Sequence, residues 1–102
     1  MTKNVDRIDL LRKATMYGDF ELTKFCIEHT NINFKTTNEF IENAGYNGYY
    51  DIVKLLLEHG ANPEGYGGLL SITKVRGHYN TNKLLNSYIR RKKLNKILKS
   101  WH

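Results

Sequence analysis

The 102-residue sequence contains one cysteine, which excludes a disulfide within the chain and fits a reducing compartment. It also contains one proline, and with 40% hydrophobic residues this argues for a folded rather than a disordered chain. No apolar run approaches the roughly 20 residues that span a bilayer. The N-terminus also lacks the apolar core of a signal peptide. We therefore expect one domain over residues 1–102, located in the cytoplasm and without a membrane partner.

The second half of the chain lacks acidic residues altogether. Residues 65–102 hold nine Lys and Arg and no Asp or Glu, which gives a net charge of +9. Residues 1–64 hold seven Lys and Arg and all ten Asp and Glu, which gives −3. This asymmetry favours an acidic partner for the second half, although it carries no information about the fold.

The stretch DIVKLLLEHGANPEG, residues 51–65, has the pattern of a short amphipathic helix with a defined end. Its apolar residues recur at helical spacing on one stripe, namely Ile52, Val53, Leu56 and Leu57. Gly60 favours the left-handed conformation that ends helices, and Pro63 cannot continue a helix because it has no backbone N–H. The stripe therefore predicts a helix packed against a partner element, with Leu56 in the core.

The same pattern recurs along the chain. A shift of 30 positions places residues 14–29 over residues 44–59 and aligns Ala, Gly, Lys and Glu-His at matching positions. A further shift of 29 places residues 77–85 over residues 48–56. One such helix pair cannot cover its own apolar face, whereas stacked copies form a continuous core. The sequence therefore predicts three copies of one helix–turn–helix unit.

The middle copy resembles the ankyrin repeat. Gly48 and residues 51–62 follow that family's second helix and the loop after it, G-H-x-x-I-V-K-x-L-L-x-x-G-A, and Gly77-His78 begins the pattern again. The Thr-Pro-Leu-His sequence that opens each first helix of the family is missing here. The period of 30 and 29 is also shorter than about 33. The resemblance implies an all-α, ankyrin-like solenoid of three helix–turn–helix repeats, with stubby turns in place of β-hairpin fingers.

We expect repeats at about 8–37, 38–67 and 68–90. Their helices are expected at 10–16 and 20–29, 39–46 and 50–59, and 69–76 and 79–89. In the third copy, Thr81, Asn82 and Asn86 replace apolar residues of the second, so we expect them on the outer face of a terminal repeat. A basic C-terminal helix is expected over 87–102. Its apolar stripe, which we expect to help close the stack, comprises Leu94, Ile97, Leu98 and Trp101.

Neither catalysis nor metal binding is expected. The chain has four histidines without metal-ligand spacing, at His29, His59, His78 and His102. Cys26 aligns with Leu56 inside the apolar stripe, so it is expected to be buried rather than nucleophilic. Residues 65–68, Gly-Tyr-Gly-Gly, lack the strand, lysine and spacing of a phosphate loop and are interpreted as a flexible turn that presents Tyr66. The sequence thus predicts a non-enzymatic protein with no cofactor and no metal.

The resemblance to ankyrin repeats also implies a contact surface for another protein. In that family the loop tips and the exposed side of the first helices form the contact face. The corresponding positions here are Lys13, Met16, Tyr17, Asn43, Tyr46, Asn47, Ile72, Val75 and Arg76, to which we add Tyr66. Rigid aromatic residues beside small polar groups suit protein recognition. The alternative is that Tyr17 and Tyr46 only cap the groove between helices.

A basic patch follows, formed by Arg90, Arg91, Lys92, Lys93, Lys96 and Lys99. Three interpretations are open for its first four residues: a solvated helix face, a contact with phosphates or an acidic protein, and a nuclear import signal. The leading function is a protein–protein interaction module, an inhibitor or adaptor. Because small diverged ankyrin chains are common in viruses and intracellular bacteria, a host protein is one class of partner. The alternative is a nucleic-acid-associated protein that uses the basic C-terminal half.

Overall fold

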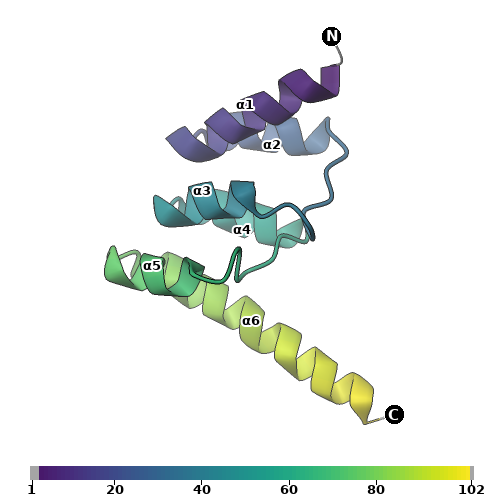
Figure 1. Ribbon diagram of the computed structural model, residues 1–102, viewed down its shortest axis with the longest axis vertical. Coiled ribbons are helices and arrows are strands. Elements are labelled where there is room, and N and C mark those ends of the chain that lie inside the picture. Colours follow the sequence, from purple (N-terminus) through teal and green to yellow (C-terminus); the bar gives the residue numbers. More distant parts are fainter. Residues whose placement is uncertain (1–2, 102) are drawn as a thin grey trace.

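The computed structural model describes the backbone of residues 3–101 and the side chains of residues 7–101. Within this range the chain forms helices and no strand (Figure 1). The helices are α1 Lys3–Tyr17, α2 Phe20–Glu28, α3 Glu39–Tyr46, α4 Tyr50–Glu58, α5 Leu69–Val75 and α6 Tyr79–Ser100. The all-α prediction is therefore confirmed.

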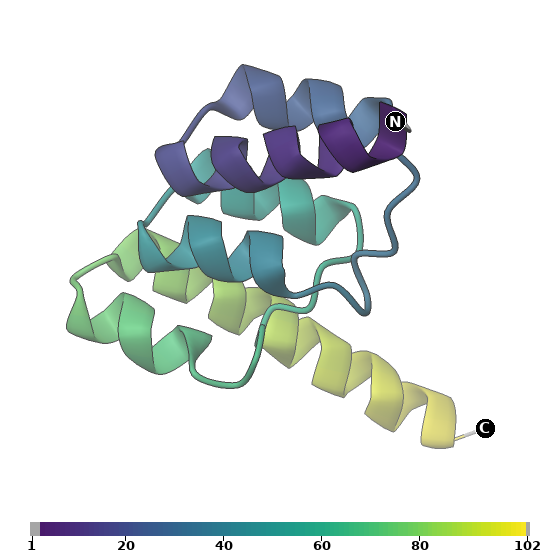
Figure 2. The same ribbon diagram turned by 45° about the horizontal axis from the view of Figure 1, so that its top comes forward.

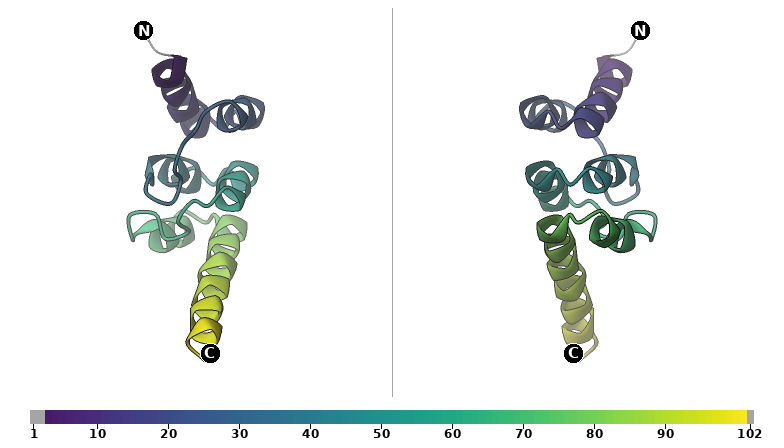
Figure 3. Two further views of the ribbon diagram at one scale, coloured as in Figure 1. Left: turned by 90° about the vertical axis from the view of Figure 1, so that its right-hand side faces the viewer. Right: turned by 90° about the vertical axis from the view of Figure 1, so that its left-hand side faces the viewer.

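The six helices form three antiparallel pairs stacked on one another, as the repeat pattern predicts. The first helices of the pairs, α1, α3 and α5, form one layer, and the second helices, α2, α4 and α6, form the other (Figure 3). The turns within the pairs lie on one side of the stack, and the linkers 29–38 and 59–68 lie on the other (Figures 1 and 2). Both linkers consist of turns and irregular backbone, which confirms the prediction of stubby connections in place of β-hairpin fingers.

The core of the stack is centred on the middle pair. All four residues of the α4 stripe are buried, and Leu56 and Val53 are completely inaccessible to solvent. Equally inaccessible side chains come from the neighbouring helices: Leu11, Cys26, Ile41, Ala44, Leu69 and Leu85. The predicted burial of Leu56 and Cys26 is therefore confirmed. Each pair contributes one side of a core that it could not close alone.

The linkers contribute to the core as well. Phe34, in the first linker, is buried and packs edge-on against Phe40 at the start of α3, with 6.1 Å between ring centroids. Ala61 and Pro63, in the second linker, are also buried. Edge-to-face aromatic pairs of this kind add stabilisation beyond the buried area. The short linkers that stand in place of hairpin fingers thus pack apolar residues of their own against the core.

The first helix begins earlier than the predicted residue 10. It starts at Lys3, because Ile8 packs against the core one turn before Leu11 and extends the buried stripe toward the N-terminus. Arg7 also donates a hydrogen bond from Nη1 to the carbonyl oxygen of His29, at the end of α2. These contacts hold an additional segment of helix that the repeat alignment does not contain.

The last helix also differs from expectation, because α6 is one continuous helix where we predicted two segments meeting near residue 87. Beyond Ile89 every described side chain is exposed, and the helix runs away from the stack below the linker side (Figure 1). The expectation that the tail helps to close the stack is therefore wrong. A helix with no bend at this point can only continue straight past the end of α4.

Two of the three polar replacements in the third copy are not on the outer face. Thr81 is 2% exposed because it keeps the inward position of Ile52. Asn82 is half-buried and donates from Nδ2 to the carbonyl of Leu70 and to Oγ1 of Thr73, at 2.8 and 3.1 Å. Its amide thus ties α5 to α6. Asn86 is exposed, as expected.

Replacing Leu56 with alanine should lower the free energy of unfolding by about 2–5 kcal/mol, since the substitution removes buried methyl groups and leaves a cavity. That loss is large against a total of roughly 5–15 kcal/mol for a small domain. Leu98→Ala is the control, because Leu98 is exposed on the tail. Urea denaturation followed by circular dichroism measures both. Equal unfolding midpoints for Leu56→Ala and the wild type would contradict the burial of the α4 stripe.

Candidate functional site

Each pair turns at a glycine in the left-handed conformation. Gly18, Gly48 and Gly77 follow the first helices with φ of +80°, +70° and +80°. Side chains other than glycine are strained at such angles. Because the pairs are stacked in register, the three turns and the helix ends before them lie above one another along one side of the molecule (Figure 2). We call this side the turn face.

A ring from each following repeat lies over the turn glycine of the repeat before it. A Cβ added to Gly18 would come within 2.9 Å of the Tyr49 ring, and one added to Gly48 would collide with the His78 ring. The Tyr49 hydroxyl donates to the carbonyl of Met16 at 3.3 Å, and His78 Nε2 lies 3.2 Å from the carbonyl of Tyr46. Since a carbonyl only accepts, the proton of His78 is on Nε2 in this contact. Successive turns are thus fixed to each other through backbone atoms.

The layer of first helices carries a second cross-link between repeats. Arg12 on α1 donates from Nε and Nη2 to the two carboxylate oxygens of Glu39 on α3. Bidentate, charge-assisted pairs of this type fix orientation as well as distance. The hydrogen bond and the negative charge of Glu39 raise the pKa of Arg12, so its guanidinium stays charged. This contact fixes α1 over α3 near the start of α3, at the linker end of the layer.

The turn face presents a row of exposed apolar and aromatic side chains from three repeats. Met16, Tyr17, Tyr46 and Val75 are 43%, 76%, 39% and 81% exposed. Arg76 connects the second and third repeats: its Nη1 donates to the Tyr46 carbonyl at 3.0 Å, and its guanidinium lies 5.8 Å from the centre of the Tyr46 ring. Interaction with the negatively charged Glu42 carboxylate raises the pKa of the Tyr46 hydroxyl. Tyr46 therefore remains neutral at physiological pH.

The other predicted contact residues are less available. Asn43 is half-buried and donates from Nδ2 to Oγ1 of Thr15 on α1, so it connects two repeats. Asn47 is exposed, but its amide donates to the Asn43 carbonyl of its own helix at 2.8 Å. Ile72 is half-buried against the core. Lys13 is exposed and pairs with Asp9 one turn earlier, at 3.3 Å between Nζ and Oδ2.

Tyr66 is exposed, as expected, but it lies in the linker 59–68, away from the turns. The glycine-rich turn around it is not a free loop. The buried carboxylate of Glu42 accepts a hydrogen bond from the Tyr66 backbone N–H at 2.7 Å, and a Cβ on Gly65 would collide with the same oxygen. This turn has its shape because a carboxylate of α3 holds it. The structure thus places Tyr66 on a separate surface from the other predicted contact residues.

Sequence reasoning missed the residues that hold the turn face together, although one signal was available. Tyr49 and His78 align with each other, directly after the turn glycines, and Asp19 is their counterpart in the first copy. Within the described residues no repeat lies before the first copy, and Asp19 caps its own helix by accepting from the N–H of Leu22 at 3.0 Å. A ring in the second and third copies and a capping residue in the first indicate a contact with the preceding repeat.

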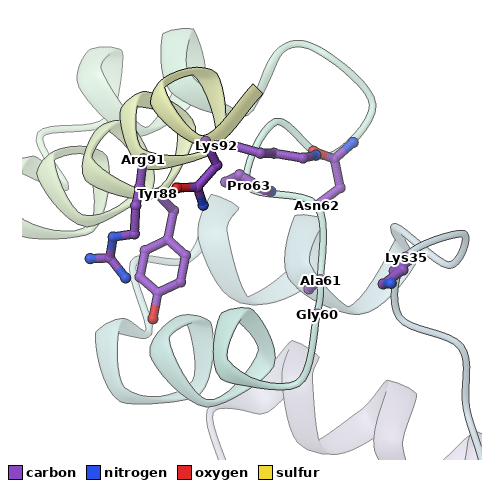
Figure 4. Close-up of a pocket in the computed structure, with 9 residues that line it drawn as sticks. Lys35, Gly60, Ala61, Asn62, Pro63, Tyr88, Arg91 and Lys92 are labelled. Atoms are coloured by element: carbon purple, nitrogen blue, oxygen red, sulfur yellow. The ribbon is translucent and has the colours of Figure 1, made fainter. Parts of the chain in front are cut away.

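The basic residues of α6 do not gather on one surface. Arg91 and Lys92 border a groove of about 480 Å³ between α6 and residues 60–63, and Lys35 lies on its far side (Figure 4). Within this groove the Arg91 guanidinium lies 4.7 Å from the centre of the Tyr88 ring. A second groove of about 510 Å³ is bordered by Lys92, Lys93, Lys96 and Lys99, with Glu64 opposite. Arg90 borders neither groove.

His29, His59 and Cys26 lie in structural positions, at helix ends and in the core. His29 and His59 end α2 and α4, and Nδ1 of each lies 2.8 and 2.9 Å from the carbonyl four residues earlier. Cys26 is completely buried, and its loss of solvent raises the pKa of the thiol, which keeps it protonated and unreactive. Within residues 7–101 no group of three metal-ligating side chains is found. His102 lies outside the described residues.

Comparison with known proteins identifies the middle of the stack. Residues 43–65 match the family model of the ankyrin repeat. The match covers the end of α3, its turn, α4 and most of the second linker, and it confirms the resemblance. Ankyrin repeats are generally protein–protein interaction modules, and the family is typically non-enzymatic. Comparison with curated proteins gave no match, and neither did comparison with solved structures.

The contact between ring and glycine can be tested with two equivalent substitutions. Gly48→Ala and Gly77→Ala both force alanine into a left-handed conformation, which costs about 1–2 kcal/mol. Only Gly48 has a ring above it, whereas a Cβ on Gly77 meets nothing within 4 Å. Gly48→Ala should therefore destabilise the protein by a further 1–3 kcal/mol or so, as overpacking does. Chemical denaturation of both variants measures the difference, and equal losses would show that the His78 ring does not lie over Gly48.

Proposed function

We propose that this chain, a stack with an ankyrin repeat at its centre, is a non-enzymatic module that binds another protein through its turn face. The row of exposed Met16, Tyr17, Tyr46 and Val75 carries the proposal. These side chains come from three repeats, and the backbone beneath them is fixed by hydrogen bonds between those repeats. Contiguous exposed apolar side chains commonly mark protein contact sites.

The chemistry of the turn face suits recognition of a folded protein surface. Tyrosine offers a large contact area with few rotatable bonds, so little conformational entropy is lost on binding. Arg76 beside Tyr46 adds a guanidinium that can donate hydrogen bonds to a partner's carboxylate while it remains stacked on the ring. Because the backbone is already ordered, binding does not carry the entropic cost of ordering it. Arg76 thus favours a partner with an acidic group opposite the second and third repeats.

The position of the two candidate surfaces supports a role as an inhibitor or adaptor. The turn face and the basic grooves lie on different sides of the molecule, one at the turns within pairs and the other beside the linker 59–68. A partner on the turn face would leave the basic side free for a second ligand, which is the arrangement of an adaptor. A partner whose own site lies under the turn face would be inhibited by occlusion.

Nucleic-acid binding is the second candidate function, and the two basic grooves favour it. Lys92 borders both grooves, so a phosphate backbone could pass from one to the other along α6. Glu64 at the edge of the second groove opposes this interpretation, because it would face the phosphates.

We propose that the chain is located in the cytoplasm. The exposed run from Arg90 to Lys93 provides a nuclear import signal if the protein enters the nucleus.

Site-specific photo-crosslinking in an extract of the native host tests the binding surface. A photoreactive phenylalanine analogue replaces Tyr17 or Val75 on the turn face, and Phe25 on α2 serves as the exposed apolar control. We expect one protein crosslinked from both turn-face positions, resistant to nuclease and absent from the Phe25 sample. Crosslinks that form equally from Phe25, or that disappear with nuclease, would contradict the proposal.

With the purified partner, the double variant Tyr17→Ala with Tyr46→Ala should raise the off-rate by about tenfold or more, because aromatic anchors carry much of an interface's energy. The variant should fold, since the hydrogen bonds between repeats at the turns use the backbone carbonyls of Met16 and Tyr46, and of these contacts the double change removes only that of Arg76 with the Tyr46 ring. Surface plasmon resonance measures both rates.

Neutralising Arg90, Arg91, Lys92 and Lys93 should lower the on-rate for the protein partner, because electrostatic steering becomes weaker, and leave the off-rate unchanged. For the nucleic-acid alternative, the same four changes should reduce the slope of log affinity against log salt by about 0.9 per lost phosphate contact on duplex DNA. Tight, salt-dependent duplex binding that survives the tyrosine changes would replace the first candidate with the second.

A further inference from the structure

The end of α6 has an apolar stripe on the face that points away from the stack. Leu94, Ile97, Leu98 and Trp101 are each 50–80% exposed. At 3.6 residues per turn their common direction is about 170° from that of Thr81, Leu85 and Ile89, the residues that bury the first half of the helix. The stripe is therefore not a continuation of the core. The helix cannot bury it against its own stack without breaking.

Charged side chains are arranged around this stripe in two groups. Arg91 and Lys93 lie on either side of the stripe, and Arg90 lies in line with it one turn before Leu94, whereas Lys92, Lys96 and Lys99 point in roughly the opposite direction. Arg91 also borders the first groove and Lys93 the second. No acidic residue occurs anywhere in residues 65–102. The tail thus combines an apolar face containing a tryptophan with a surrounding surface of one charge sign.

We propose that the end of α6 binds the surface of an anionic lipid bilayer, with its apolar stripe in the interface and Arg90, Arg91 and Lys93 among the headgroups. None of the described helices is long and apolar enough to cross a membrane, so the contact is peripheral. An apolar face with Trp and Leu, bordered by Lys and Arg, is typical of helices that lie in the plane of the interface. The lack of a spanning segment and of a signal peptide, from which we expected no membrane partner, does not bear on a peripheral contact of this kind.

Other occupants satisfy only part of this arrangement. A nucleic acid would neutralise the cations but leave the stripe in water. A second copy would bury the stripe, yet it would bring two tails together that each carry six positive charges. An anionic bilayer matches both the charge and the apolar face. It also leaves the stack and its turn face in solution, because the stack lies on the opposite side of α6 from the stripe.

Trp101 makes the proposal directly measurable, because it is the only tryptophan of the chain. The full-length protein is titrated with vesicles of phosphatidylcholine alone and with vesicles containing 30% phosphatidylserine. We expect a blue shift of Trp101 emission and co-sedimentation with the anionic vesicles only, both weakened by salt. No shift with the anionic vesicles, or an equal shift with the neutral ones, would overturn the proposal. A concentration-dependent blue shift without lipid would overturn it in favour of a dimer.

Two triple variants of equal charge separate a membrane from other anions. Arg90→Gln, Arg91→Gln and Lys93→Gln should weaken binding to the anionic vesicles by roughly a hundredfold, since each cation near the surface contributes about a factor of five. Lys92→Gln, Lys96→Gln and Lys99→Gln, on the opposite side, should weaken it much less. A larger loss from the second triple would place the anion in the grooves and overturn the proposal.

The apolar stripe is tested with Ile97→Ser combined with Leu98→Ser, against Phe25→Ser as an exposed apolar control on α2. The tail variant should fold, because its residues lie outside the core, and circular dichroism checks this. We expect it to lose the Trp101 blue shift while the control retains it. Unchanged vesicle binding by the tail variant would show that the charges act alone and would overturn the proposal.

Discussion

The burial of α3 and α4 between the outer helix pairs is the constraint on which the rest of the structure depends. Ile41 and Ala44 on α3, and Val53 and Leu56 on α4, are completely inaccessible to solvent. A helix pair of this length has apolar residues on both of its stacking faces and cannot cover them alone. The outer pairs each cover one of these faces. They are therefore stable only as neighbours of the middle pair.

The same stacking defines where function can be placed. Because the pairs repeat in register, their turns come to one side and their linkers to the other, so one chain presents two distinct surfaces. At the turns, backbone carbonyls take part in the contacts between repeats, which leaves side chains such as Tyr17 and Val75 free to meet a partner. On the linker side, the turn at Tyr66 is held by the buried Glu42. Rigidity at both surfaces therefore comes from inside the stack.

Much of the fold could be predicted because it is encoded locally. The helix α3 was predicted with its observed bounds, and α2, α4 and α5 within one residue, since apolar spacing and a following glycine set both ends of a short helix. The early start of α1 and the unbroken α6 could not be predicted from the alignment of repeats, because the extra segments have no counterpart in the other copies. Thr81 is polar but occupies a position that faces inward in every copy, so its polarity alone predicts the wrong face.

The candidate site was predictable only in part, because several of its contacts join residues of different repeats. Exposure of Tyr17, Tyr46 and Val75 follows from their position at helix ends. The roles of Asn43, Tyr49 and His78 depend on atoms about 30 residues away in the preceding repeat, and Glu42 likewise contacts the next linker. Such contacts can be predicted from a sequence only if the copies are assumed to stack in register. The alignment of Tyr49 with His78 after the turn glycines is the pattern that indicates them.

Native-state hydrogen exchange, followed residue by residue with NMR, tests the central claim most directly. If the middle pair holds the stack together, the amides of α3 and α4 should show the highest protection, opening only with global unfolding. Protection should decrease through α2 and α5 and be lowest in residues 91–100 of α6, where every side chain is exposed. Protection in α1 and α2 that equals or exceeds that of α3 and α4 would contradict the account, because it would show that the first pair is stable without the middle one.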